Sequence, residues 1–211
     1  MGASSDIPST STATTDASNR TLGLRLDGAY KLDDNWKGLY TAEYAKQDNY
    51  KGNSDLIDAH YYKFGGGAMY QTWSLRIVQE LLSSNSGKYG FQTPLGINHL
   101  FQGWADLFLT TPGQGIRDTY VTLATSIKNA KLMAEYHDYK SDKDFKTIGN
   151  TLVAHYGTEL DFSVAYPLTD KLNAKLEYAK FNEDDVYGTS LQAAPRKPDT
   201  EKIWATMMYT F

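Results

Sequence analysis

Residues 22–32, LGLRLDGAYKL, place apolar and charged side chains at alternate positions. In a β-strand, successive side chains point to opposite faces of the sheet. Leu22, Leu24 and Leu26 would therefore share one face with Tyr30, while the intervening residues carry the charges. A helix would need apolar residues at a period near 3.6, which this stretch does not have. The segment predicts a strand with one apolar and one charged face.

The same two-residue period continues to the C-terminus and predicts an all-β chain. It predicts nine strands, at 22–32, 36–47, 58–70, 73–82, 118–127, 130–139, 152–168, 171–182 and 201–211. Short connections (33–35, 71–72, 128–129 and 169–170) alternate with long ones (48–57, 83–117, 140–151 and 183–200). In an antiparallel up-and-down sheet this puts all short turns at one end, an asymmetry typical of outer-membrane β-barrels.

Composition excludes several classes of protein. The chain has 211 residues, of which 41% are hydrophobic and 22% charged, as expected for one folded domain. A formal net charge of −4 gives no basic excess for a nucleic-acid partner. The absence of cysteine removes disulfides and thiolate chemistry. No apolar run approaches the roughly 20 residues of a spanning helix, but spanning strands need no such run.

Aromatic residues on the apolar face fall into two groups, as expected for belts at the two interfaces of a membrane. Near the long-connection end the expected belt is Tyr44, Tyr62, Tyr136, Tyr156 and Tyr178. Near the short-turn end it is Tyr30, Trp36, Tyr70, Trp73, Tyr166, Tyr209 and Phe211. Ten tilted residues from Tyr156 to Tyr166 would span roughly 23–25 Å, the height of an apolar band. We therefore expect a transmembrane β-barrel whose apolar face contacts outer-membrane lipid.

The opposite face would then line a water-filled pore with charges of both signs, which set the field across the pore. For each charge, simple solvation without a role in solute contact remains open. The predicted pore-lining residues are Arg25, Asp27, Lys31, Glu43, Lys63, Arg76, Glu80, Asp118, Lys131, Glu135, Glu159, Asp161, Lys175 and Glu177.

The 83–117 connection is too long and too apolar for an ordinary surface loop. We expect it to fold inward and act as a constriction or plug; a loop that only folds over the rim is the alternative. The residues predicted to form the constriction are Phe91, Pro94, Phe101, Trp104, Asp106, Phe108 and Arg117. Asp106 and Arg117 could steer ions, or could pair with each other and hold the loop.

Several motifs resemble those of known porins. The last strand, KIWATMMYTF (202–211), is similar to the C-terminal signature that the barrel assembly machinery reads, with Tyr209 and Phe211 as its signal residues. The segments ELLSSNSG (80–87), YGFQTPLG (89–96), FQGWAD (101–106), TTPGQGIRDTY (110–120) and EYHDY (135–139) resemble the C-terminal half of porins of the alginate-export family. The resemblance covers about residues 20–211 and implies a Gram-negative outer-membrane barrel with passive transport. The balanced charge of the predicted pore does not favour a uronate polymer as substrate.

An odd number of strands does not close a typical bacterial barrel. We therefore expect residues 20–211 to be part of a larger barrel, with 1–19 as a Ser/Thr-rich extracellular loop or tail. A tenth strand within 1–19 is the alternative, although SSDIPSTSTA (4–13) offers few apolar residues to lipid.

The predicted function is a porin that passes small hydrophilic solutes passively, with no catalytic residues, metal or cofactor. His137 and His155 fall on the predicted pore face, but the spacing of the histidines does not impose a metal site. The carboxylate pair Glu159 and Asp161 suits a charged pore without catalysis. A soluble β-sandwich or barrel binding module and an outer-membrane barrel enzyme remain the alternatives. The oligomeric state is not predicted.

Overall fold

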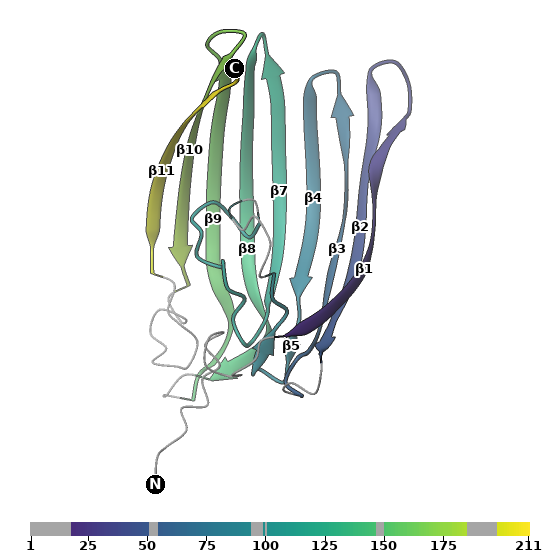
Figure 1. The fold of residues 1–211 in the computed structure, drawn as a ribbon, viewed down its shortest axis with the longest axis vertical. Coiled ribbons are helices and arrows are strands. Elements are labelled where there is room, and N and C mark those ends of the chain that lie inside the picture. Colours follow the sequence, from purple (N-terminus) through teal and green to yellow (C-terminus); the bar gives the residue numbers. More distant parts are fainter. Residues whose placement is uncertain (1–17, 51–54, 94–98, 100, 147–149, 185–197) are drawn as a thin grey trace.

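The computed structural model describes residues 18–50, 55–93, 99, 101–146, 150–184 and 198–211. Nine of its strands are long (Figure 1): β1 (Asn19–Lys31), β2 (Trp36–Asn49), β3 (Asp58–Tyr70), β4 (Trp73–Leu82), β7 (Ile116–Ile127), β8 (Ala130–Lys146), β9 (Leu152–Pro167), β10 (Leu172–Glu183) and β11 (Thr200–Tyr209). Two short strands, β5 (Ser84–Asn85) and β6 (Tyr89–Gly90), pair with each other within the connection from β4 to β7. No helix among the described residues is long and apolar enough to cross a membrane.

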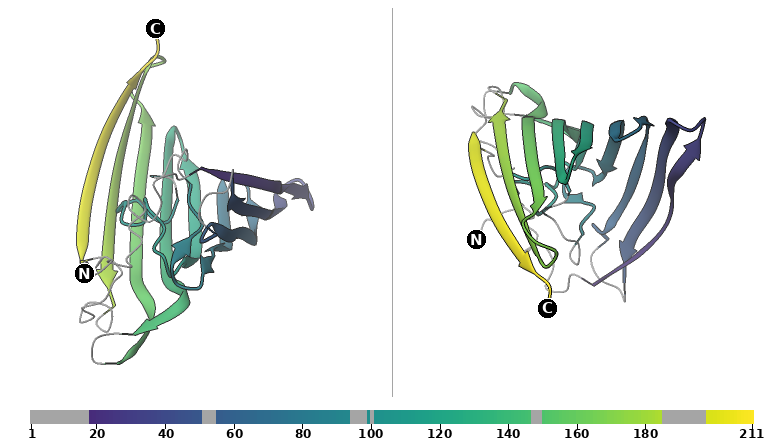
Figure 2. Two further views of the ribbon diagram at one scale, coloured as in Figure 1. Left: turned by 60° about the horizontal axis from the view of Figure 1, so that its bottom comes forward. Right: turned by 90° about the horizontal axis from the view of Figure 1, so that it is seen from above.

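The long strands form one antiparallel sheet in the order β1-β2-β3-β4-β7-β8-β9-β10-β11. Each strand therefore pairs with its nearest long neighbours in the chain, which confirms the predicted up-and-down fold. The sheet is strongly curved but not closed (Figure 2), so β1 and β11 are its two edges. The described part of the β4 to β7 connection lies on the concave side of this curve (Figures 1 and 2).

The convex face is lined by exposed apolar side chains, whereas a cluster of buried apolar side chains, including Phe108, Tyr139 and Phe181, lies on the concave side beneath the β4 to β7 connection. Leu24, Ile77 and Leu160 are 80%, 57% and 49% exposed, whereas Asp118 and Asp161 on the concave face are fully buried. This distribution is the reverse of that in a soluble protein, where apolar side chains are buried. The β-sandwich alternative is wrong for the described residues, because they form a single large sheet with nothing packed on its apolar face.

Aromatic side chains at the short-turn end of the convex face are exposed as predicted. Trp36 and Tyr70 lie there on adjacent strands, with their ring centroids 4.7 Å apart. Both rings are a little over 40% exposed. Large amphipathic rings in this position suit the boundary between hydrocarbon and headgroups.

One residue of the other predicted belt is misplaced. Tyr156 was expected on the lipid face but is fully buried on the concave side, where its hydroxyl donates a 2.9 Å hydrogen bond to the Gly115 carbonyl. The reason is a register shift: Lys140 pairs with His155 and Tyr139 with Gly157, so Tyr156 is an extra residue in β9. Such a β-bulge interrupts the alternation of side chains.

The same irregularity changes two other expectations. β8 continues to Lys146, seven residues beyond the predicted end at 139. His155 does not share a face with His137. Its Nε2 atom lies 2.5 Å from the carboxylate of Asp138, which directly follows His137 in β8 and so points to the opposite face.

We predict that a charge on the convex face is costly. Ile77 lies near the middle of β4, so Ile77→Arg should lower the free energy of unfolding in lipid vesicles by about 2–4 kcal/mol. Ile77→Ala serves as the control for lost side-chain volume. Urea titration followed by tryptophan fluorescence measures both variants. A cost below about 0.5 kcal/mol for the arginine variant, the range of an ordinary surface change, would contradict a lipid contact.

Candidate pore-lining site

A row of charged side chains crosses the concave face from β1 to β7. Arg25, Glu43, Lys63, Glu80 and Asp118 are successive register partners on five adjacent strands. Directly opposed side chains in such pairs lie within interaction distance. The first four charges alternate in sign, whereas Glu80 and Asp118 bring two carboxylates together. The row therefore changes from alternating charges at β1–β3 to two negative charges at β4 and β7.

Other predicted pore-lining residues lie beside this row of charges. Arg25 Nε lies 2.6 Å from Asp27 Oδ1, and Lys31 Nζ lies 2.7 Å from Asp34 at the short-turn end. Arg76 is the register partner of Thr122, whose hydroxyl donates a 2.5 Å hydrogen bond to Glu135. Lys131 pairs with Ala165 towards the short-turn end of β8 and β9, and Lys175 forms a 2.5 Å ion pair with Glu177.

The connection between β4 and β7 binds the buried carboxylates of β4 and β9. The backbone N–H of Ala105 donates to Glu159 (2.6 Å), and that of Trp104 donates to Asp161 (3.1 Å). The Gln102 side chain donates to Glu80 (3.0 Å). Glu80, Glu159 and Asp161 are 2% exposed or less, so each needs such donors to offset lost hydration.

Aromatic packing also joins the connection between β4 and β7 to strands β8, β9 and β10. The ring of Phe108 lies 4.8 Å from that of Tyr139, 5.6 Å from Tyr156 and 6.0 Å from Phe181, as measured between centroids. Tyr139, Tyr156 and Phe181 are fully buried. These contacts come from β8, β9 and β10, so Phe108 anchors the connection across three strands.

The remaining predicted constriction residues occupy different environments. Phe91 is buried against Tyr61, with centroids 5.7 Å apart, whereas Phe101 is 40% exposed and lies 5.8 Å from Lys63 Nζ. Trp104 is buried, and Lys175 Nζ lies 5.7 Å from its ring. Pro94 lies outside the described residues.

Asp106 and Arg117 do not pair with each other as one interpretation suggested. Asp106 lies 2.8 Å from His99 Nδ1 and 3.8 Å from Lys202 Nζ, while Arg117 faces Asp142 at 3.8 Å. Asp106 therefore forms an ion pair with β11, and Arg117 forms one with β8.

Gln47 is a contact residue that sequence reasoning missed. Its amide oxygen accepts hydrogen bonds from the Tyr89 hydroxyl (2.7 Å) and the Gln92 N–H (3.0 Å), and its amide nitrogen donates to the Gln92 carbonyl (2.9 Å). Burial raises the pKa of Tyr89 to about 12, so this hydroxyl remains a donor at neutral pH. Gln47 was on the correct face, but a neutral side chain at a strand end carries no signal of such a role.

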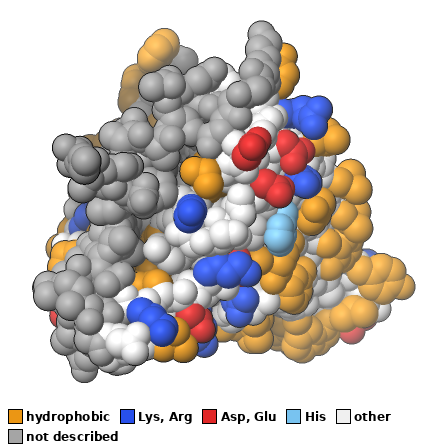
Figure 3. All heavy atoms as spheres, turned by 90° about the horizontal axis from the view of Figure 1, so that it is seen from below, with side chains coloured by type: hydrophobic (Ala, Val, Ile, Leu, Met, Phe, Trp, Pro, Cys, Tyr) orange, Lys and Arg blue, Asp and Glu red, His pale blue; other side chains and the backbone are white. Residues whose placement is uncertain are grey.

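Figure 3 shows the end of the molecule that carries the long connections. Charged side chains of both signs lie in the middle of this view, and hydrophobic side chains gather along the right-hand rim. At this end Lys46 forms ion pairs with Asp48 (3.3 Å) and Asp58 (3.2 Å), and Arg20 lies 3.5 Å from Asp48.

Gly103 provides a test of how closely the connection fits. Its φ is +80°, and a Cβ atom there would clash with the Tyr139 hydroxyl and the Glu159 carboxylate. Gly103→Ala should therefore speed hydrogen exchange of the Trp104 and Ala105 amides by at least about tenfold, equivalent to about 1.4 kcal/mol.

Gly87→Ala is the matched control for this substitution. Gly87 has a similar φ of +75° but has no atom within 4 Å of an added Cβ, so the variant isolates backbone strain from the clash. Equal exchange rates at Trp104 and Ala105 in the two variants would show that close packing of Gly103 against Tyr139 and Glu159 does not protect these amides.

Comparison with known proteins gives a fold but no family. No protein-family model and no curated protein matches the chain. Among solved structures, the chain is similar to Acinetobacter baumannii OccAB3 (TM-score 0.59, 11% identity) and to Pseudomonas aeruginosa OccK5 (TM-score 0.59, 10% identity). The matches cover 90% and 92% of this chain but only 48% and 51% of those proteins. The chain thus spans about half the length of these outer-membrane porins, and its antiparallel up-and-down strands match part of their barrels. The resemblance to the alginate-export family is not confirmed by these matches.

Proposed function

We propose that the protein is part of a bacterial outer-membrane porin that passes small hydrophilic solutes passively. The observation that carries this proposal is the inverted distribution of side chains: apolar residues are exposed on the convex face, while Glu80, Asp118 and Asp161 are buried on the concave one. Lipid outside would satisfy the apolar convex face, and charged side chains on the concave face suit the wall of a water-filled channel. The similarity in fold to OccAB3 and OccK5 supports the proposal.

The barrel of the proposed channel contains more strands than the nine described here. In a bilayer, the unpaired backbone edges of β1 and β11 would each leave several N–H and C=O groups without partners. OccAB3 and OccK5 are about twice as long as this chain. In a barrel of that size, further strands would pair with the edges of β1 and β11. Assembly in the outer membrane would then use the predicted signal residues Tyr209 and Phe211, both of which are exposed.

We further propose that the described part of 83–117 narrows the channel. Phe91, Trp104 and Phe108 are buried against the concave wall, and the donors to Glu80, Glu159 and Asp161 fix the segment there. A segment held by contacts with several strands occupies space that water would otherwise fill. Such an obstruction selects solutes by size.

Deleting residues 88–112 should raise single-channel conductance in planar bilayers by at least about twofold, because the obstruction is removed. The experiment uses protein extracted from outer membranes. Ile77→Ala, which changes a side chain exposed on the convex face, is the control and should leave the conductance near its original value. Unchanged conductance after deletion of 88–112 would exclude the constriction role.

The sign of the pore charge gives a second test of the channel. Arg76→Gln removes a positive charge from the concave face and should shift the reversal potential towards cation preference in a salt gradient. Lys180→Gln is the matched control. Ala179 is fully buried on the concave side, so its neighbour Lys180 points to the convex face, where it pairs with Glu201 (3.3 Å). Equal shifts in the two variants would argue against a pore on the concave face.

A further inference from the structure

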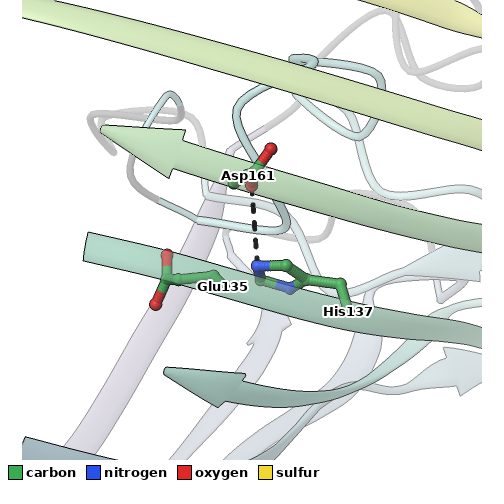
Figure 4. Close-up of side chains that lie close together, drawn as sticks. All are labelled: Glu135, His137 and Asp161. Carbon is green, nitrogen blue, oxygen red and sulfur yellow. Dashed lines mark ion pairs between the residues drawn. The ribbon is translucent and has the colours of Figure 1, made fainter. Parts of the chain in front are cut away.

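Three ionisable side chains converge on the concave face where β8 and β9 pair. Glu135 and His137 are two residues apart on β8, and Asp161 of β9 is the register partner of Glu135 (Figure 4). One ligand atom from each lies within 4.8 Å of the others. Ligand atoms on one tetrahedral ion with bonds of about 2.0–2.1 Å lie about 3.3 Å apart, so small side-chain rotations would bring these three atoms onto a single ion.

The imidazole of His137 is oriented by a carboxylate on its other side. Asp118 of β7 places both oxygens near His137 Nδ1, at 2.9 and 3.1 Å. A hydrogen bond from Nδ1–H to Asp118 leaves Nε2 with a free lone pair. A carboxylate, a histidine and a metal in this order form a recurrent unit of metal sites, in which the outer carboxylate fixes the tautomer and the ring orientation.

The Nε2 atom of His137 points into the cluster without a hydrogen bond. It is buried and has no hydrogen-bond partner among the described residues. His137 itself is 3% exposed, and the nearest carboxylate oxygen, on Asp161, is 3.7 Å away (dashed line in Figure 4). A lone pair facing a carboxylate is repelled by it, and 3.7 Å is too long for a hydrogen bond from a protonated ring. A cation between the two groups resolves both problems.

The charge and space around the cluster also favour a cation. Glu80, Asp118, Glu159 and Asp161 are all buried, and several of their hydrogen bonds come from uncharged amide groups of Gln102, Trp104 and Ala105. Buried carboxylates are costly unless an opposite charge lies near. A cavity of about 40 Å³ is lined by Glu135 and His137 together with residues 101–104, and can hold a water ligand of the ion.

We propose that Glu135, His137 and Asp161 bind one divalent transition-metal ion, through His137 Nε2 and one oxygen of each carboxylate, with water completing the shell. One imidazole and two carboxylates favour Zn²⁺ over Mg²⁺ or Ca²⁺, which prefer oxygen ligands alone. The ion would join β8 to β9 beneath residues 102–104 and so stiffen the wall at the proposed constriction. Binding itself does not depend on the proposed channel function.

The test uses protein purified from outer membranes in detergent, stripped with a chelator and titrated with Zn²⁺ against a chromophoric competitor. We expect one site, weakened by at least about 100-fold in His137→Gln and about 10–100-fold in Asp118→Asn, which removes only the orienting carboxylate. His155→Gln is the matched control. The ring nitrogens of His155 already face Asp138 and Asp184, at 2.5 and 3.0 Å, so this variant should bind like the original protein.

X-ray absorption at the zinc edge of the unmodified protein provides a measurement that does not depend on the folding of any variant. One imidazole nitrogen among oxygen ligands supports the proposal. Absence of a bound ion, a spectrum without a single imidazole, or equal affinity in the folded His137→Gln variant would overturn it. Conductance is measured separately, so failure of the metal site and failure of the channel are distinguishable.

Discussion

The requirement that backbone amides be paired organises the described sheet. Hydrocarbon offers no hydrogen bonds, so a chain that crosses it as strands must pair each strand with its neighbours. Nine antiparallel strands joined in chain order meet this requirement everywhere except at the outer edges of β1 and β11, and they do so with short turns at one end. Once the ladder is set, the two-residue alternation gives each strand one apolar and one polar side, except where the β9 bulge interrupts it. The location of apolar and charged side chains then follows from position alone.

The concave face depends on a second condition, which is that buried carboxylates find partners. Glu159 and Asp161 obtain theirs from the backbone of Ala105 and Trp104, and Glu80 from Gln102. The connection between β4 and β7 therefore does more than fill space, because the wall and the connection satisfy each other's polar groups. A substitution that removes one partner while the wall and the connection stay packed would leave a buried group without its hydrogen bond, at about 1–3 kcal/mol or more for a charged group.

The fold could be predicted from the sequence because alternation is a local property. Leu22 to Leu32 and the segments that follow carry it without reference to any other strand. Tyr156 could not be placed in this way, because the bulge that turns it inward depends on the pairing of Gly157 with Tyr139. The cluster of Glu135, His137 and Asp161 was missed for a related reason. Its third member arrives through the register between two strands, whereas a search for ligand spacing considers one strand at a time.

The two halves of the concave face differ in what they leave accessible, and this bears on where solutes would pass. Asp118 and Asp161 in the β7–β9 region are fully buried, and the segment around Trp104 lies over Asp161. On β1 and β2, by contrast, the side chains of Arg25, Asp27 and Glu43 are 58%, 47% and 28% exposed. In the proposed channel, solutes would therefore meet the balanced charges of β1 and β2, while the carboxylates of β7 and β9 hold the constriction in place. The charges on β1 and β2 would set which ions pass. The carboxylates on β7 and β9 would affect transport indirectly, by fixing the position of the connection between β4 and β7.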